Sequence, residues 1–66
     1  MRLTINGAEK EFEGLDTVAD LLGEMGLDPR KVVVELNEKI VRRTQIGETP
    51  LSEEDTIEIL RFVGGG

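Results

Sequence analysis

Three consecutive glycines, Gly64, Gly65 and Gly66, follow directly on the hydrophobic run 57–63, whose composition predicts a β-strand. Glycine has no side chain to pack and loses more conformational freedom on ordering than other residues, so fold stability does not explain them. We therefore expect a slender arm, about 10 Å long when extended, that presents the α-carboxylate of Gly66 inside a narrow tunnel of another protein. A frayed chain end, or residues left by recombinant expression, is the alternative interpretation.

The rest of the sequence offers few groups for catalysis. The 66 residues include no cysteine and no histidine, which removes the most nucleophilic side chain, the commonest general base and the usual zinc ligands. The acidic cluster 53–55 lacks the alternating spacing of a calcium loop, and no Walker-type loop, Rossmann glycine pattern or nucleophile elbow occurs. We predict that the protein is not an enzyme, has no metal site and binds no cofactor, so any ATP-dependent activation of its carboxylate takes place on a partner.

Charge and hydropathy argue against binding to nucleic acid, against binding to an anionic membrane and against a membrane-spanning segment. The net charge of −6 argues against non-specific binding to nucleic acid or to an anionic membrane, although plain solubility also explains it. No stretch has the character of a signal peptide or approaches the ~20 apolar residues of a membrane span. We expect one cytoplasmic domain that is a monomer when free.

The elements that must hold the glycine arm begin with a hairpin. Apolar and polar residues alternate over residues 1–5, and Asn6-Gly7 supplies the positive φ angles of a two-residue turn. The second strand is predicted over about Ala8–Glu13, with Phe12 as its core anchor and its glutamates in solvent.

A helix follows the hairpin. Thr17 is its predicted N-cap with Asp20 as the capping-box acid, and Gly26 is expected to end it in a left-handed conformation. Its apolar stripe has the i, i+3, i+4, i+7 spacing and consists of Val18, Leu21, Leu22 and Met25.

The second half of the chain predicts three further strands. A β-branched strand runs from Lys31 to Leu36, a turn at Asn37-Glu38 leads to a short strand over 39–43, and the last strand covers 56–63. Between them lies an irregular stretch, 44–55, in which residues 52–55 are assigned to one helical turn. The order predicts an α+β fold of the ubiquitin-like β-grasp type, in which one helix packs across a mixed sheet of four to five strands. Residues 1–63 form this domain and residues 64–66 its flexible tail.

The last strand carries a second functional feature. If Ile57 and Ile59 face the helix, Leu60 and Phe62 are left on the opposite face as an apolar docking patch beside the tail. The alternatives are that the 44–55 loop covers them or that the register is reversed. Depending on register, the patch also includes Ile5, Val33 and Val41. The basic pair Arg42-Arg43 is either solvated or pairs with an acidic group.

The whole chain resembles the ThiS family of sulfur carriers from thiamine thiazole biosynthesis. The resemblance is carried by the Asn6-Gly7 hairpin, the helix start 17–22, the segment 34–41 and the closing run 57–66. The family often has Ile-Val-Pro-Arg after the central strand, where this chain has residues 40–43 as Ile-Val-Arg-Arg. Arg43 therefore aligns with the family arginine, and the proline is absent.

The resemblance implies a carrier function. A ThiF-like enzyme would adenylate the Gly66 carboxylate with ATP, sulfur from a persulfide made by a donor such as a cysteine desulfurase system would displace AMP, and the thiocarboxylate would deliver sulfur to a ThiG-like thiazole synthase. Gly65 would be the required slender neighbour, and Leu60, Phe62 and Arg43 would contact partners. The same fold and di-glycine end occur in the small subunit of molybdopterin synthase and in ubiquitin-related protein modifiers, which stay open as alternatives. A non-catalytic interaction module is another.

Overall fold

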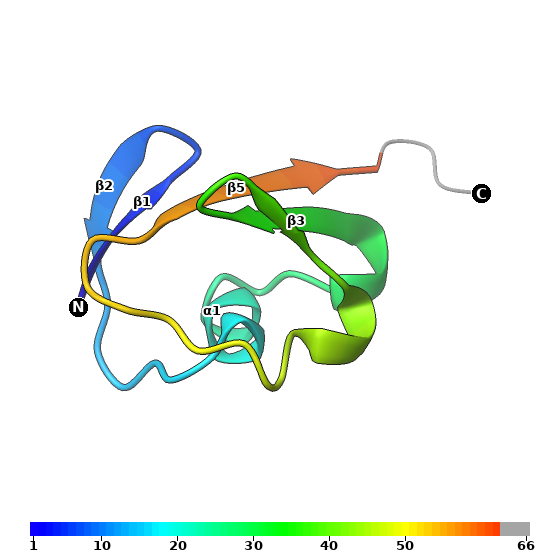
Figure 1. The fold of residues 1–66 in the computed structure, drawn as a ribbon, viewed down its shortest axis with the longest axis horizontal. Helices are drawn as coiled ribbons and strands as arrows, with labels where there is room; N and C mark the ends of the chain where they lie inside the picture. Colours follow the sequence, from blue (N-terminus) through cyan, green and yellow to red (C-terminus); the bar gives the residue numbers. More distant parts are fainter. Residues whose placement is uncertain (63–66) are drawn as a thin grey trace.

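The computed structural model describes residues 1–62. Figure 1 shows a sheet with one helix packed on one of its faces and no helix on the other. The elements are β1 (Arg2–Ile5), β2 (Ala8–Glu11), α1 (Val18–Glu24), the 3₁₀-helix η1 (Pro29–Lys31), β3 (Val32–Leu36), β4 (Lys39–Val41), the 3₁₀-helix η2 (Arg43–Gln45) and β5 (Thr56–Arg61).

The sheet is mixed, with strand order β2-β1-β5-β3-β4. β1 and β5 run parallel at the centre, and every other neighbouring pair is antiparallel. A parallel pair requires a crossover, and here α1 with β3 and β4 supplies the chain between β1–β2 and β5. This is the predicted β-grasp fold, with five strands and one main helix.

Helix α1 has both of its predicted ends. The Thr17 hydroxyl accepts a hydrogen bond from the Asp20 N–H at 3.3 Å, and the Asp20 carboxylate accepts one from the Thr17 N–H at 3.0 Å, which completes a capping box. At the other end Gly26 has φ +69°, and the Leu27 N–H donates to the Leu22 carbonyl at 2.9 Å. This is a Schellman motif, and it directs the chain toward β3.

The core lies between the sheet and α1. Val18, Leu21 and Leu22 of the predicted stripe are buried, and Met25 is half-buried at the helix C-cap. Alternate residues of the strands meet this stripe, as period-two burial requires. The buried apolar residues are Leu3, Ile5, Leu15, Val18, Leu21, Leu22, Val34, Leu51, Ile57 and Ile59.

Three local predictions were wrong. The short strand predicted over 39–43 ends at Val41, because residues 43–45 form the 3₁₀-helix η2 instead. β2 ends at Glu11 and not at Glu13, because β1 begins at Arg2 and the last backbone partner on that side is Met1, which pairs with Phe12. Phe12 is half-buried against the core as predicted. Residues 52–55 form a turn and not a helical turn, since Glu54 has φ +69°.

The loop between β4 and β5 packs beside the start of α1. The carbonyls of Ile46 and Thr49 accept hydrogen bonds from the Ala19 and Val18 N–H groups at 2.9 and 3.0 Å. Leu51 in the same loop is buried in the core. The loop therefore satisfies donors at the helix N-terminus and lies on the helix side of the sheet, away from the open face (Figure 1).

Candidate functional site

The site is built at the end of β5, where the chain leaves the sheet (Figure 1). Gly64, Gly65 and Gly66, together with Val63, lie outside the described residues. The structure thus defines the strand end to which the predicted arm is attached. The predictions that concern the arm itself remain predictions.

The strand end is held by its buried face and by its β3 edge. Ile57 and Ile59 are buried beneath the sheet, with 0% and 6% of their surface exposed. On the β3 side, the Phe62 N–H donates to the Lys31 carbonyl at 3.0 Å. This holds the backbone in the sheet up to the last described residue.

The face of β5 away from α1 carries the predicted apolar patch. Leu60 and Phe62 have 57% and 56% of their surface exposed. Leu60 lies opposite Val33 of β3, which is half-buried on the same face. The 44–55 loop does not cover them. The prediction that Leu60 stands on the open face is therefore confirmed. Phe62 is exposed as well, but it lines a pocket together with Gly26 and Leu27 at the C-terminal end of α1.

Sequence reasoning missed one member of this face. Ile40 has 68% of its surface exposed. The register pairs Ile40 with Glu35 and Glu35 with Glu58, so Ile40 points to the same side as Leu60, two strands away. The positive φ angles at Asn37 and Glu38 set this register through a two-residue turn. We call Val33, Ile40 and Leu60 the open-face patch, and the exposed Phe62 lies next to it at the strand end; Ile5 is buried instead and Val41 is half-buried opposite the core residue Val34.

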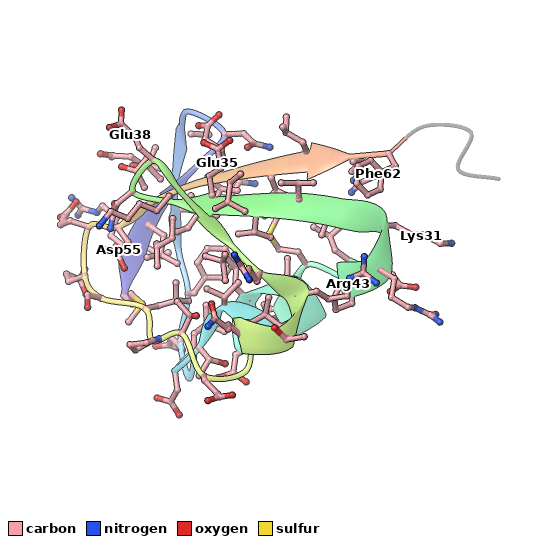
Figure 2. The ribbon with its side chains drawn as sticks, turned by 45° about the vertical axis from the view of Figure 1, so that its right-hand side comes forward. Lys31, Glu35, Glu38, Arg43, Asp55 and Phe62 are labelled. Atoms are coloured by element: carbon pink, nitrogen blue, oxygen red, sulfur yellow. The ribbon has the colours of Figure 1, made fainter. Side chains whose placement is uncertain are left out.

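Arg43 begins η2 and is exposed. The pairing of Val34 with Val41 brings the end of β4 to the same end of the sheet as the start of β3 and the end of β5. Figure 2 shows Arg43, Lys31 and Phe62 at this end, with Glu38 and Asp55 at the opposite end. Arg43 thus lies at the same end of the sheet as the end of β5, although β3 separates β4 from β5.

A shallow pocket of about 350 Å³ lies under the strand end. Its floor includes the half-buried Leu27 and Val32, and its charged members are Asp28, Lys31 and Arg61. Arg30 donates side-chain and backbone hydrogen bonds to the Asp28 carboxylate, and these contacts lower the pKa of that carboxyl to about 2. Asp28 therefore stays ionised, and its charge is already matched by Arg30.

Residues 1–62 were searched for groups that could hold a metal ion and for helices that could span a membrane. No three acidic, histidine or cysteine side chains of this part of the chain are grouped closely enough to hold a metal ion. None of its helices is long and apolar enough to cross a membrane.

Comparison with known proteins identifies one family. The ThiS family model matches residues 3–66. The sulfur carrier protein ThiS of Bacillus subtilis is 37% identical over 65 residues, which cover 97% of this chain and 98% of that protein. The crystal structure of the thiamine biosynthesis protein ThiS from Geobacter metallireducens superposes with a TM-score of 0.84 and 33% identity, and all of both chains is covered.

Longer relatives also contain this segment. A thiazole synthase of Paramagnetospirillum magneticum is 46% identical over 66 residues, which are all of this chain and 20% of that protein. A thiazole synthase of Magnetococcus marinus is 39% identical over the same length and share. The chain thus spans about a fifth of these two relatives and nearly all of the Bacillus protein.

Proposed function

The chain belongs to the ThiS family, and from this membership we propose that it is a sulfur carrier in thiamine biosynthesis whose working group is the carboxylate of Gly66. The observation that carries the proposal is the match to the Bacillus carrier over nearly the full length of both chains. The three glycines after β5 support it, because they give the slender arm that such a carrier requires.

The proposed chemistry starts from a poor electrophile. A carboxylate resists nucleophilic attack because its charge repels nucleophiles and oxide is a bad leaving group. Attack of the Gly66 carboxylate on the α-phosphate of ATP releases pyrophosphate and gives an acyl-adenylate, from which a persulfide sulfur displaces AMP. The product of this displacement is an acyl disulfide. A thiol reductant cleaves its S–S bond and is itself oxidised to a disulfide, which leaves the thiocarboxylate as the sulfur donor for thiazole formation. This chain supplies the carboxylate and its presentation, and a ThiF-like partner supplies nucleotide binding and catalysis.

The geometry of β5 supports presentation of this group. The hydrogen bond between the Phe62 N–H and the Lys31 carbonyl fixes the start of the arm. The open-face patch and the exposed Phe62 next to it provide apolar area for a partner, with Leu60 and Phe62 more than half exposed. A docked partner thus receives the arm at a defined distance from the patch.

Thiazole synthase is the proposed acceptor. Two relatives that carry this name contain a segment like this chain within a longer polypeptide. Two domains that act one after the other benefit from being joined in one chain, because the link gives each domain a high effective concentration at the site of the other. The proposal needs a free Gly66 carboxylate in the cell, which the intact mass of the protein isolated from its native source measures.

Intact-mass spectrometry tests the carrier chemistry. After incubation with the ThiF-like enzyme, ATP and a persulfide donor, the protein should gain the mass difference between one sulfur and one oxygen atom. Gly65→Ala should slow this conversion because a side chain enters the tunnel. Gly23→Ala is the matched control, since a methyl group there meets no atom within 4 Å. An unchanged mass, with an enzyme shown to be active on another carrier, would reject the proposal.

A non-catalytic interaction module is the second candidate, and the exposed Leu60 and Phe62 favour it. Deletion of Gly65 and Gly66 separates the two functions. A carrier loses sulfur transfer and keeps partner binding, whereas a pure interaction module loses neither its binding nor its cellular role. Supplying the thiocarboxylated protein to thiazole synthase and to a molybdopterin synthase large subunit then identifies the acceptor.

A further inference from the structure

The backbone of β5 changes its environment along its length. The backbone N–H and C=O groups of the even-numbered residues of β5 point toward β3. The hydrogen bonds from the Asn37 N–H to the Thr56 carbonyl (2.8 Å) and from the Phe62 N–H to the Lys31 carbonyl (3.0 Å) show this. The backbone N–H and C=O groups of the odd-numbered residues point toward β1, and the Asn6 N–H donates to the Ile57 carbonyl at 2.9 Å. The N–H and C=O of Ile59 and Arg61 therefore point toward the β1–β2 hairpin.

At Ile59 a side chain replaces the missing strand. The hairpin turns at Asn6-Gly7, so β1 has no residue to pair with Ile59. The Asn6 amide takes its place: the Oδ1 atom accepts from the Ile59 N–H at 2.7 Å, and the Nδ2 group donates to the Ile59 carbonyl at 3.2 Å. This amide ends the pairing on that side.

Arg61 is the next residue on the same side, and it lies beyond the amide. Within residues 1–62, its N–H and C=O have no hydrogen-bond partner in the protein. β5 is therefore a central strand as far as Ile59 and an edge strand at Arg61. An open edge is a template for a further strand.

We infer that an extended acidic segment of the adenylating partner adds to the sheet at this edge and pairs with the N–H and C=O of Arg61. The inference rests on the proposed function, because it names how the partner grips the arm. The partner must surround the residues that follow Arg61 directly, so its chain passes beside this edge. Pairing here fixes the path of the arm before it enters the active site.

The charges around the edge determine the chemistry of the segment. In an added strand, the residue opposite Arg61 points to the same face as the Arg61 side chain. That face holds the pocket lined by Arg61 and Lys31, in which the Asp28 carboxylate is already paired with Arg30 at 3.0 Å. An acidic side chain at this position thus meets two cations, although the whole chain is acidic.

Amide hydrogen exchange followed by NMR tests the pairing directly. In the free protein the Arg61 N–H should exchange fast and the Phe62 N–H slowly, since only the latter is bonded within the sheet. In the saturated complex with the ThiF-like enzyme, exchange at Arg61 should slow by about tenfold or more, as a new hydrogen bond requires. Unchanged exchange at Arg61 in that complex would overturn the inference.

Two variants separate the backbone from the side chain. Arg61→Gln removes the charge, and Arg61→Pro removes the charge and the N–H donor. Proline is tolerated there because the lost donor is unpaired in the free fold, so the melting temperatures of both should match the wild type. Relative to Arg61→Gln, Arg61→Pro should lower kcat/KM for adenylation by about tenfold, the equivalent of one hydrogen bond of roughly 1.4 kcal/mol. Equal kcat/KM values would contradict strand addition.

Different experimental results would reject strand addition at Arg61 and the proposed carrier function. If the wild type is converted to the thiocarboxylate while Arg61 stays unprotected, only strand addition is wrong. If the wild type is not converted at all, the carrier proposal fails and the inference fails with it. Equal effects of both variants that vanish at high salt would show that the side-chain charge alone guides the encounter.

Discussion

The amide of Asn6 holds the backbone of β5 at Ile59 on the side of β1, and its removal gives the sharpest prediction. It makes two hydrogen bonds to the Ile59 backbone, at 2.7 and 3.2 Å. Its own backbone has φ +49°, a left-handed conformation that asparagine and glycine tolerate better than other residues. Substitution at this position therefore removes two bonds and, for most residues, also adds backbone strain.

The two contributions are separated by two substitutions. Asn6→Ala loses both bonds, worth about 1 kcal/mol each, and adds about 1 kcal/mol of strain, so it should destabilise the fold by about 3 kcal/mol. Asn6→Gly loses the bonds without the strain and should cost about 2 kcal/mol. A domain of this size has a total stability of roughly 3–10 kcal/mol, so either loss is a large fraction of it.

Urea denaturation and thermal melting measure these losses. At about 4–8 °C per kcal/mol, Asn6→Ala should lower the melting temperature by roughly 12–24 °C and Asn6→Gly by roughly 8–16 °C. Lys39→Ala, at an exposed position of β4, is the control and should stay within about 0.5 kcal/mol. Equal losses for alanine and glycine would refute the backbone argument, and losses below about 1 kcal/mol for both would refute the role of the amide.

Three other predictions follow from the same structure. Leu60→Ser and Phe62→Ser should each lower kcat/KM with the adenylating partner by about tenfold or more, as for an interface anchor, and leave the melting temperature unchanged; a normal kcat/KM would exclude the open-face patch and the adjacent Phe62 as the docking surface. Thr17→Ala should cost about 1 kcal/mol by removal of the helix cap, whereas Thr17→Ser should be nearly neutral; equal urea midpoints for the two would argue against the cap. The pKa of Asp28 is lowered to about 2 by hydrogen bonds from Arg30, so its contribution to stability is present above its ordinary pKa of about 4 and is lost as the pH falls toward about 2. The difference in melting temperature between the wild type and Asp28→Asn should therefore close on acidification over that range, and a constant difference would contradict the assignment.

Local signals predicted the local elements correctly. The Asn6-Gly7 turn, the Thr17 capping box and the left-handed Gly26 depend on residues within one turn of each other, and all three are present. The misassigned turn at 52–55 shows the limit of this reasoning. Its conformation is set by Asp55, whose carboxylate accepts from the Ser52 N–H at 2.7 Å, and by the Glu54 N–H, which donates to the carbonyl of Arg2 in β1.

The division of the β5 side chains between two opposite faces also followed from the sequence, because side chains alternate along a strand. It separated Ile57 and Ile59 from Leu60 and Phe62 before any partner strand was known. Which pair is buried depends on the face that α1 covers. Ile40 illustrates the same point, since its exposure follows from a register between two strands and from the absence of a second layer.

The sequence by itself set the chemical possibilities: it holds three consecutive glycines at 64–66, from which a carboxylate arm is predicted, and it holds no thiol or imidazole. It also determined the helix, the hairpin and the alternation of β5, because these depend on neighbours in the chain. Only the tertiary structure decided that Arg43 lies at the same end of the sheet as Lys31, that Ile40 joins Leu60 on the open face, and that pairing on one side of β5 stops before Arg61. The physical reason is that these features depend on strand order and register between segments distant in the chain, which no local pattern specifies.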